Sequence, residues 1–198
     1  MLEQRIQQHF IDSADLKYQA AQILGQPIAA AIQAILACVT SGAKVLACGT
    51  GPSAAQAEQF AALCVMGFER ERPELAALAL VPDALWAAPS VAGADIAALA
   101  RQVRALGQAG DLLLVLTAGG DEPALLDAVQ AAHERDMTVV ALCGRDGGAL
   151  ATLLRETDVL ISVPHDRAAR VREVHALVLH CLCDGIDAQL LGEQENML

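Results

Sequence analysis

The feature that most constrains the fold is a series of short apolar runs that alternate along the chain with longer helical patterns. The runs are KVLAC (44–48), LAALALV (75–81), LLLVLT (112–117), TVVALC (138–143) and DVLISV (158–163). Apolar and polar residues do not alternate within them, which is typical of strands covered on both faces. Repeated alternation of such strands with helices predicts an α/β fold in which a parallel sheet lies between layers of helices.

Helical periodicity fills most of the remaining chain. Residues 3–24 and 27–41 are predicted to form two helices, because Gly25 and Pro27 interrupt the pattern between them. Further helices are predicted at 53–66, at 95–107, from the loop after residue 117 to about 135, at 148–154 and at 167–191. The stretch PDALWAAPSVAGAD (82–95) is predicted to be irregular. No linker is visible, so the 198 residues are expected to form one domain.

Composition narrows the classes of partner. The net charge of -11 disfavours direct binding to nucleic acid, because an acidic surface repels phosphates. Hydrophobic residues make up 55% of the chain and aromatic residues only 3%, so the core must consist of Ala, Leu and Val. Such small side chains predict an Ala-rich helical surface that is shared between subunits.

The cysteines and the apolar runs indicate a cellular compartment. Six cysteines lie inside apolar runs without a CxxC pair, which favours buried, reduced thiols over a disulfide framework or a zinc ribbon. The N-terminal residues MLEQRIQQHFID do not resemble a targeting segment. The apolar runs are shorter than the ~18 residues of a membrane span. We therefore expect a cytoplasmic protein without a membrane partner.

Two glycine-containing loops follow predicted strands, at VLACGTGPS (45–53) and LLLVLTAGGDEP (112–123). Ligands of parallel α/β folds bind at the carboxyl ends of the strands, where these loops lie. A loop that opens a helix binds anions through free N–H groups, and Ser53 adds a hydroxyl. Pro52 removes one potential donor. The alternative is a tight turn in which Ser53 caps the helix.

Several longer stretches resemble a known family. They are CGTGPSAAQAEQFAA (48–62), FERERP (68–73), RQVRALGQAGDLLLVLT (101–117), DMTVVALCGRDGG (136–148) and ARVREVHALVLHCLCDGID (169–187). Together they resemble sugar isomerase (SIS) domains, and more narrowly the phosphoheptose isomerases and the related DnaA initiator-associating proteins.

The resemblance implies an α/β three-layer sandwich with a five-stranded parallel sheet, two N-terminal helices and a long C-terminal helix. A single SIS domain would then span residues 1–198, and the helical extension at 1–41 would be used in oligomerisation. The implied assembly is a homotetramer with sugar-phosphate pockets near the subunit interfaces.

For a sugar-phosphate ligand, the resemblance implies contacts in both glycine loops. The candidate ligand-binding residues are Gly49, Thr50, Gly51, Ser53, Thr117 and Gly120. Asp121 and Glu122 are expected to cap their own helix and to repel a phosphate, which predicts a second loop without a ligand.

The family's proton-transfer positions are largely replaced. The resemblance places a His/Glu pair on the helix after the first loop and a Gln/His pair on the last helix, and these four positions can hold zinc. The corresponding residues here are Gln59, Leu63, Arg172 and His180, so only His180 matches and no catalytic residue is assigned with it. One imidazole does not make a zinc site, so no cofactor is expected unless the chain is an isomerase. His175 and His180 are each expected to be a packed or capped histidine.

These replacements favour a non-catalytic regulator that resembles the initiator-associating proteins and binds the replication initiator DnaA as a tetramer. Leu190 and Leu191 are the partner-binding candidates that this resemblance implies. The alternative is a phosphoheptose isomerase acting on sedoheptulose 7-phosphate, or a sensor that binds a sugar phosphate.

Overall fold

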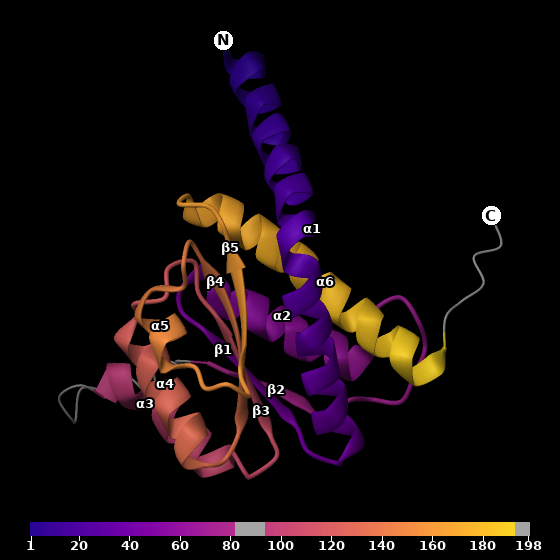
Figure 1. Ribbon diagram of the computed structural model, residues 1–198, viewed down its shortest axis with the longest axis vertical. Coiled ribbons are helices and arrows are strands. Elements are labelled where there is room, and N and C mark those ends of the chain that lie inside the picture. The colour runs from indigo at the N-terminus through magenta and orange to yellow at the C-terminus, as the bar shows by residue number, and fades with distance from the viewer. Residues whose placement is uncertain (82–93, 193–198) are drawn as a thin grey trace.

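The computed structural model describes residues 1–81 and 94–192 of the chain (Figure 1). The predicted irregular stretch at 82–95 therefore lies almost wholly outside the described residues. The described elements, in chain order, are α1 (Leu2–Thr40), β1 (Val45–Gly49), α2 (Pro52–Met66), β2 (Ala77–Leu80), α3 (Ala94–Leu106), β3 (Leu112–Leu116), α4 (Pro123–Glu134), β4 (Thr138–Gly144), α5 (Gly148–Leu153), β5 (Val159–Val163) and α6 (Ala168–Leu191).

The strands form one five-stranded sheet in the order β2-β1-β3-β4-β5. Every pair is parallel, and the register aligns Val45 of β1 with Leu112 of β3 and Leu112 with Thr138 of β4. The carboxyl ends of β1, β3 and β4 consequently lie together at one edge of the sheet. The predicted α/β fold class with a five-stranded parallel sheet is confirmed.

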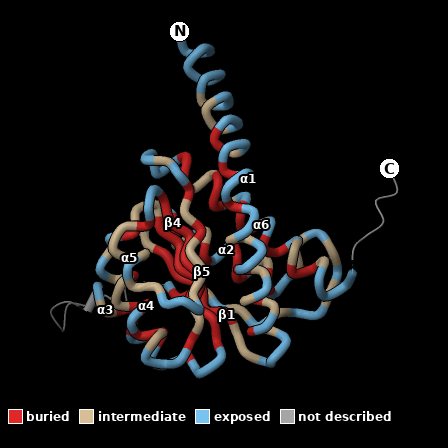
Figure 2. The backbone as a smooth tube through the Cα atoms, in the orientation of Figure 1, coloured by how far each residue is buried: buried red, intermediate tan, exposed pale blue. Residues whose placement is uncertain are grey.

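Burial follows the position of each strand in the sheet. Every residue of β1 and β3 is buried, whereas the edge strands β2 and β5 are partly exposed. Figure 2 shows the buried strands at the centre of the molecule. One apolar cluster packs α1, α2 and α6 against one face, and a second packs α3, α4 and α5 against the other. The three-layer sandwich results from this double coverage.

The N-terminal region differs from the expectation of two helices, because α1 is one continuous helix of 39 residues with Pro27 inside it. An interior proline costs about 3 kcal/mol in a helix. The cost is offset by burial on both sides of the proline, where Leu24, Ala31 and Ile35 lie in the core. Propensity at Gly25 and Pro27 is therefore overridden by packing, chiefly against α6.

Two helices are long and apolar enough to cross a membrane when only length and composition are considered. They are α1 and α6, each of which contains an 18-residue window, with a mean hydropathy of 1.8 and 1.3 respectively. Helices at the core of a water-soluble protein meet the same criterion. In α6, 44% of the window is buried within the chain itself.

A buried carboxylate joins the amino ends of two central strands, at the sheet edge opposite the loops. Asp111 immediately precedes β3, and it accepts hydrogen bonds from the backbone N–H groups of Lys44 (3.0 Å) and Gln108 (2.9 Å). It also forms an ion pair with Lys44 Nζ. Burial raises the pKa of Asp111, but the bonds from Lys44 and Gln108 outweigh burial and hold that pKa below its usual value.

We expect Asp111→Asn to lower the free energy of unfolding at neutral pH by about 1–3 kcal/mol, because the substitution removes a charge-assisted bond. The folded-state pKa lies below the unfolded value, so this stabilisation is present above the ordinary carboxyl pKa of about 4 and is lost as pH falls below it. Denaturant unfolding at several pH values measures both effects. Asp136→Asn is the matched control, since Asp136 is exposed. An equal loss of unfolding free energy in both variants would contradict the stabilising role assigned to Asp111.

Candidate functional site

A cleft of about 420 Å³ lies at the carboxyl ends of β1, β3 and β4, beside the first turns of α2 and α6. Both glycine loops contribute to its walls. Its polar side chains are those of Thr50, Ser53, Glu122, Arg145, Asp166 and Arg172. The cleft therefore combines two hydroxyls, two carboxylates and two guanidinium groups, a set suited to a polar, charged ligand.

The first loop turns tightly into α2. A Cβ on Gly49 would lie 2.6 Å from the carbonyl carbon and oxygen of Ser53, so only glycine permits this close approach. Gly51 has a positive φ of 53°, and Pro52 occupies the first helical position. The N–H groups of Ser53 and Ala54 donate to Thr50 O and Gly51 O within the turn, both at 3.1 Å. The loop has the shape of an anion cradle, but these two donors are already bonded.

The second loop is stabilised by bonds among its own residues. Thr117 is fully buried, and its hydroxyl donates to the carboxylate of Glu122 at 2.7 Å. The same oxygen accepts from Gly119 N at 3.0 Å, while Gly120 N donates to Glu122 at 3.2 Å. Thr117 thus positions Glu122 in the cleft wall.

The expectation that Asp121 and Glu122 both cap α4 is wrong. Glu122 occupies the N-cap position but makes no side-chain capping bond, because its carboxylate turns back to Thr117 and Gly120. Asp121 instead accepts a hydrogen bond from Ala149 N at 2.8 Å, at the start of α5. Consequently only one of the two carboxylates lines the cleft.

Close glycine contacts join the loops that contribute to the cleft. A Cβ on Gly120 would lie 2.1 Å from Gly147 O, and one on Gly144 would lie 2.4 Å from Ala118 O. The loops after β3 and β4 therefore touch backbone to backbone. Gly120 and Gly49 act through this packing, whereas Thr50, Gly51 and Ser53 are the predicted ligand-binding residues that line the cleft.

The sequence analysis did not identify Arg145 as a cleft residue, and it placed Arg172 only at a position where the family resemblance implies a proton-transfer residue. Arg145 follows the buried strand β4 in the turn GRDGG, and its Nε lies 2.8 Å from Asp166 Oδ1. Arg172 lies on α6, where its carbonyl accepts from Gln56 Nε2 of α2 at 2.8 Å. The sequence did contain one indication of this position, because Arg145 directly follows a predicted parallel strand. Ligands of parallel α/β folds bind at the carboxyl ends of the strands.

The positions that correspond to the family's proton-transfer residues are not brought together in the cleft. Of the four, Arg172 lines it, while Leu63 packs against the core and Gln59 is exposed. His180 is partly buried and its ring lies 5.2 Å from that of Phe68 between centroids. None of the other three positions therefore supplies a proton-transfer group beside His180.

The same positions do not fit zinc, because only His180 is a zinc ligand among them. Within residues 1–81 and 94–192, no three His, Cys, Asp or Glu side chains are grouped as a metal ion requires. We derive no chemistry from zinc.

His175 lies in the core beneath the cleft. It is fully buried, and one ring nitrogen, Nε2, is 3.1 Å from Cys143 O. Burial is the main cause that lowers the pKa of His175 to about 4; the Cys143 carbonyl opposes the shift and the charge of Arg172 adds to it. The imidazole is accordingly neutral at pH 7.

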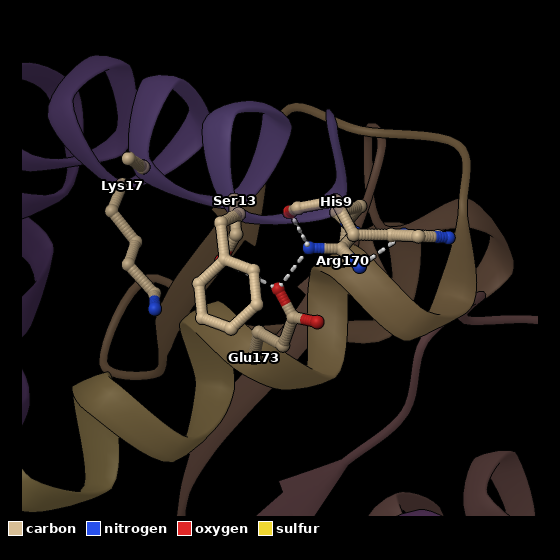
Figure 3. A pocket seen from close by; sticks show the side chains of 7 residues that line it. His9, Ser13, Lys17, Arg170 and Glu173 are labelled. Atoms are coloured by element: carbon tan, nitrogen blue, oxygen red, sulfur yellow. Dashed lines mark hydrogen bonds and ion pairs between the residues drawn. The ribbon is translucent and has the colours of Figure 1, made fainter. Parts of the chain in front are cut away.

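A second cavity, of about 380 Å³, lies between α1 and the first turns of α6 (Figure 3). Arg170 crosses it, donating to His9 O at 3.1 Å and to Glu173 Oε2 at 2.6 Å. Glu173 also accepts from Ser13 Oγ at 2.7 Å. Glu173 thus joins the two helices and is not among the residues that line the cleft.

Leu190 and Leu191 lie in the last turn of α6, at the end opposite the cleft. They are 37% and 41% exposed. A partner bound there would not contact a ligand in the cleft.

Comparison with known proteins shows the family of this chain. Residues 9–144 match the family model described as "SIS domain". The chain belongs to the SIS domain family. It is 58% identical to a phosphoheptose isomerase of Methylibium petroleiphilum over 98% of both chains. It is 49% identical to that of Azoarcus sp. over 96% of this chain and 98% of the relative.

Two solved SIS structures superpose closely. A phosphoheptose isomerase from Neisseria gonorrhoeae has a TM-score of 0.88 at 43% identity, covering 95% of this chain and 100% of that one. Another from Francisella tularensis has a TM-score of 0.89 at 40% identity, covering 94% and 98%.

These relatives contradict the interpretation of the chain as a non-catalytic regulator of replication initiation. Proteins named phosphoheptose isomerase match nearly the full chain at up to 58% identity, so the alternative interpretation fits better. The error arose because the substitutions at Gln59, Leu63 and Arg172 were given more weight than the similarity of the remaining chain.

We expect Thr117→Val to lower the free energy of unfolding by about 1–2 kcal/mol, because Glu122 loses its hydroxyl donor within a partly buried loop. Thr117→Ser keeps the hydroxyl and is the matched control. Thermal unfolding of the two variants measures the difference. If Thr117→Val kept its stability and lost only ligand affinity, Thr117 would contact the ligand directly.

Proposed function

We propose that this protein is a sugar-phosphate isomerase of the phosphoheptose type, acting on sedoheptulose 7-phosphate in the cleft. The observation that carries the proposal is the 58% identity over 98% of the chain to a protein named phosphoheptose isomerase. The position of the cleft supports it, since ligands of parallel α/β folds bind at the carboxyl ends of the strands.

Aldose–ketose isomerisation takes a proton from the carbon beside the carbonyl and returns it to the former carbonyl carbon. The step needs a base that becomes an acid, and a group that steadies the enediolate. Two described carboxylates line the cleft, and Asp166 is 81% exposed in its side chain and paired with Arg145. We therefore assign proton transfer to Glu122, which Thr117 holds in place.

A second candidate function is a sensor that binds the sugar phosphate without converting it. One observation favours it: Gln59 and Leu63 occupy the positions at which the family resemblance implies a histidine and a glutamate. Neither side chain exchanges a proton near neutral pH. Binding is common to both candidates, and turnover separates them.

We also propose that the chain assembles as a homotetramer in the cytoplasm. The N-terminal half of α1 extends beyond the rest of the molecule (Figure 1). It carries apolar side chains that are largely exposed in one chain, including Leu2 (72%), Phe10 (75%) and Tyr18 (76%). A projecting helix with such a surface is stabilised by packing against other copies.

We expect calorimetry to detect binding of sedoheptulose 7-phosphate to the purified protein, and a coupled assay to detect its conversion to the aldose. Glu122→Gln should reduce turnover by about 100-fold or more while binding persists, since removing a general base has an effect of that size. Glu58→Gln is the control, because Glu58 is exposed and does not line the cleft. Binding without turnover would identify a sensor, and neither binding nor turnover would refute both candidate functions.

We expect light scattering to give a mass of four 20.6-kDa chains. Phe10→Asp should shift the protein to smaller species, because a carboxylate in an apolar interface is unfavourable. Leu106→Asp, an equally drastic change at a side chain of α3 that is 40% exposed, should leave the mass unchanged. A tetramer that survives Phe10→Asp would place the interface elsewhere, and circular dichroism would confirm that both variants are folded.

A further inference from the structure

We propose that Arg145 and Arg172 form a guanidinium clamp for the phosphate of the ligand, replacing the backbone donors of the glycine loops; this inference rests on the proposed function. Both side chains line the cleft, one from the end of β4 and the other from α6. Ser53, which is nearly buried in the cleft wall, adds its hydroxyl between them and the first loop.

Several backbone donors of the two glycine loops are already bonded. The N–H groups of Ser53 and Ala54 donate within the first turn, and Pro52 has none. In the second loop, the N–H groups of Gly119 and Gly120 donate to the side chains of Thr117 and Glu122. Recognition of a phosphate must therefore rely more on side chains than in an open glycine cradle.

Both guanidinium groups are available to a ligand. No carboxylate of residues 1–81 or 94–192 forms an ion pair with Arg172. The Arg145–Asp166 pair has side chains that are 61% and 81% exposed, and such pairs are weak and readily exchanged. A phosphate oxygen can take the place of Asp166, because guanidinium binds phosphate through two parallel hydrogen bonds.

The backbone of Arg145 is strained but firmly held. Its φ is 56°, in the left-handed region that residues other than glycine, asparagine and aspartate seldom adopt. Arg145 N donates to Val163 O at 2.8 Å, and Arg145 O accepts from the hydroxyl of Ser162. These bonds to β5 hold the residue in place. Strained, firmly held residues beside a cleft are typical of ligand sites.

Positive and negative side chains are balanced in the cleft. The protein has a net charge of -11, and Glu122 places a negative charge in the cleft wall. The two arginines offset Glu122 and Asp166, so an incoming phosphate does not meet a negative cleft. An acidic chain can bind an anionic sugar in this way, because local charges act more strongly than distant, solvent-screened ones.

The test compares Arg172→Gln and Arg145→Gln with wild type. Arg172→Gln introduces the amide that the family resemblance implies at this position. We expect each substitution to raise the Kd for sedoheptulose 7-phosphate by about 10- to 100-fold, the usual effect of losing a hydrogen bond between charged groups. The Kd for inorganic phosphate should rise in parallel, whereas binding of unphosphorylated sedoheptulose should not change.

Matched variants separate charge from geometry and from folding. Arg172→Lys keeps the charge but not the two parallel bonds, so its Kd should lie between those of wild type and Arg172→Gln. Arg104→Gln loses the same charge on α3 outside the cleft and should bind as wild type does. If Arg145→Gln does not fold, Arg145→Lys replaces it as the test variant at this position. Raising the salt concentration should weaken wild-type binding more than binding by the double variant Arg145→Gln/Arg172→Gln.

The failure of this inference is distinguishable from failure of the proposed function. If wild type binds or converts sedoheptulose 7-phosphate and the folded arginine variants do so equally well, the clamp is refuted and the proposed function stands. If wild type binds neither sedoheptulose 7-phosphate nor inorganic phosphate, both are refuted.

Discussion

The structure depends on the burial of its three central strands on both faces. β1, β3 and β4 have no exposed residue, so helices must cover both faces of the sheet. The connections to these helices must therefore leave the sheet at the ends of the strands. Because the strands are parallel, the loops that open α2, α4 and α5 all lie at the same edge. At the opposite edge, Asp111 joins the amino ends of β1 and β3 through Lys44. The cleft is a consequence of this arrangement, whatever ligand it holds.

Close backbone contacts at that edge shape the chemistry of the cleft. Gly49 lies against Ser53 of its own loop, and Gly120 lies against Gly147 of a neighbouring one. These contacts leave no room for a Cβ on Gly49 or Gly120, and several N–H groups of the loops bond within the loops. The groups left to meet a ligand are side chains on the rim, above all Glu122 and the two arginines. The bonds within the loops thus leave fewer free backbone donors beside the cleft than an open glycine loop would have.

Membership of a family and the identity of a site's residues are separate pieces of information. The whole chain resembles phosphoheptose isomerases, whereas the positions held by Gln59, Leu63 and Arg172 depart from the family pattern. The departures were first interpreted as evidence for a regulator, and the similarity of the full chain overturned that interpretation. Folds host many chemistries, so function must be argued from the cleft itself. There, Glu122 and Arg172 provide one carboxylate and one cation that the first interpretation had placed outside the chemistry.

The sequence by itself determined the class of fold, because unbroken apolar runs specify doubly covered strands and the helical period is strong between them. It also located both glycine loops at the ligand-binding edge. Only the tertiary structure decided that α1 continues through Pro27, since packing of Leu24 and Ala31 outweighs local propensity. It also decided that Asp121 turns to α5, that Thr117 is buried, and that Arg145 and Arg172 share the cleft. Residues 27 positions apart meet because the end of β4 and the start of α6 lie side by side, a relation that no local pattern encodes.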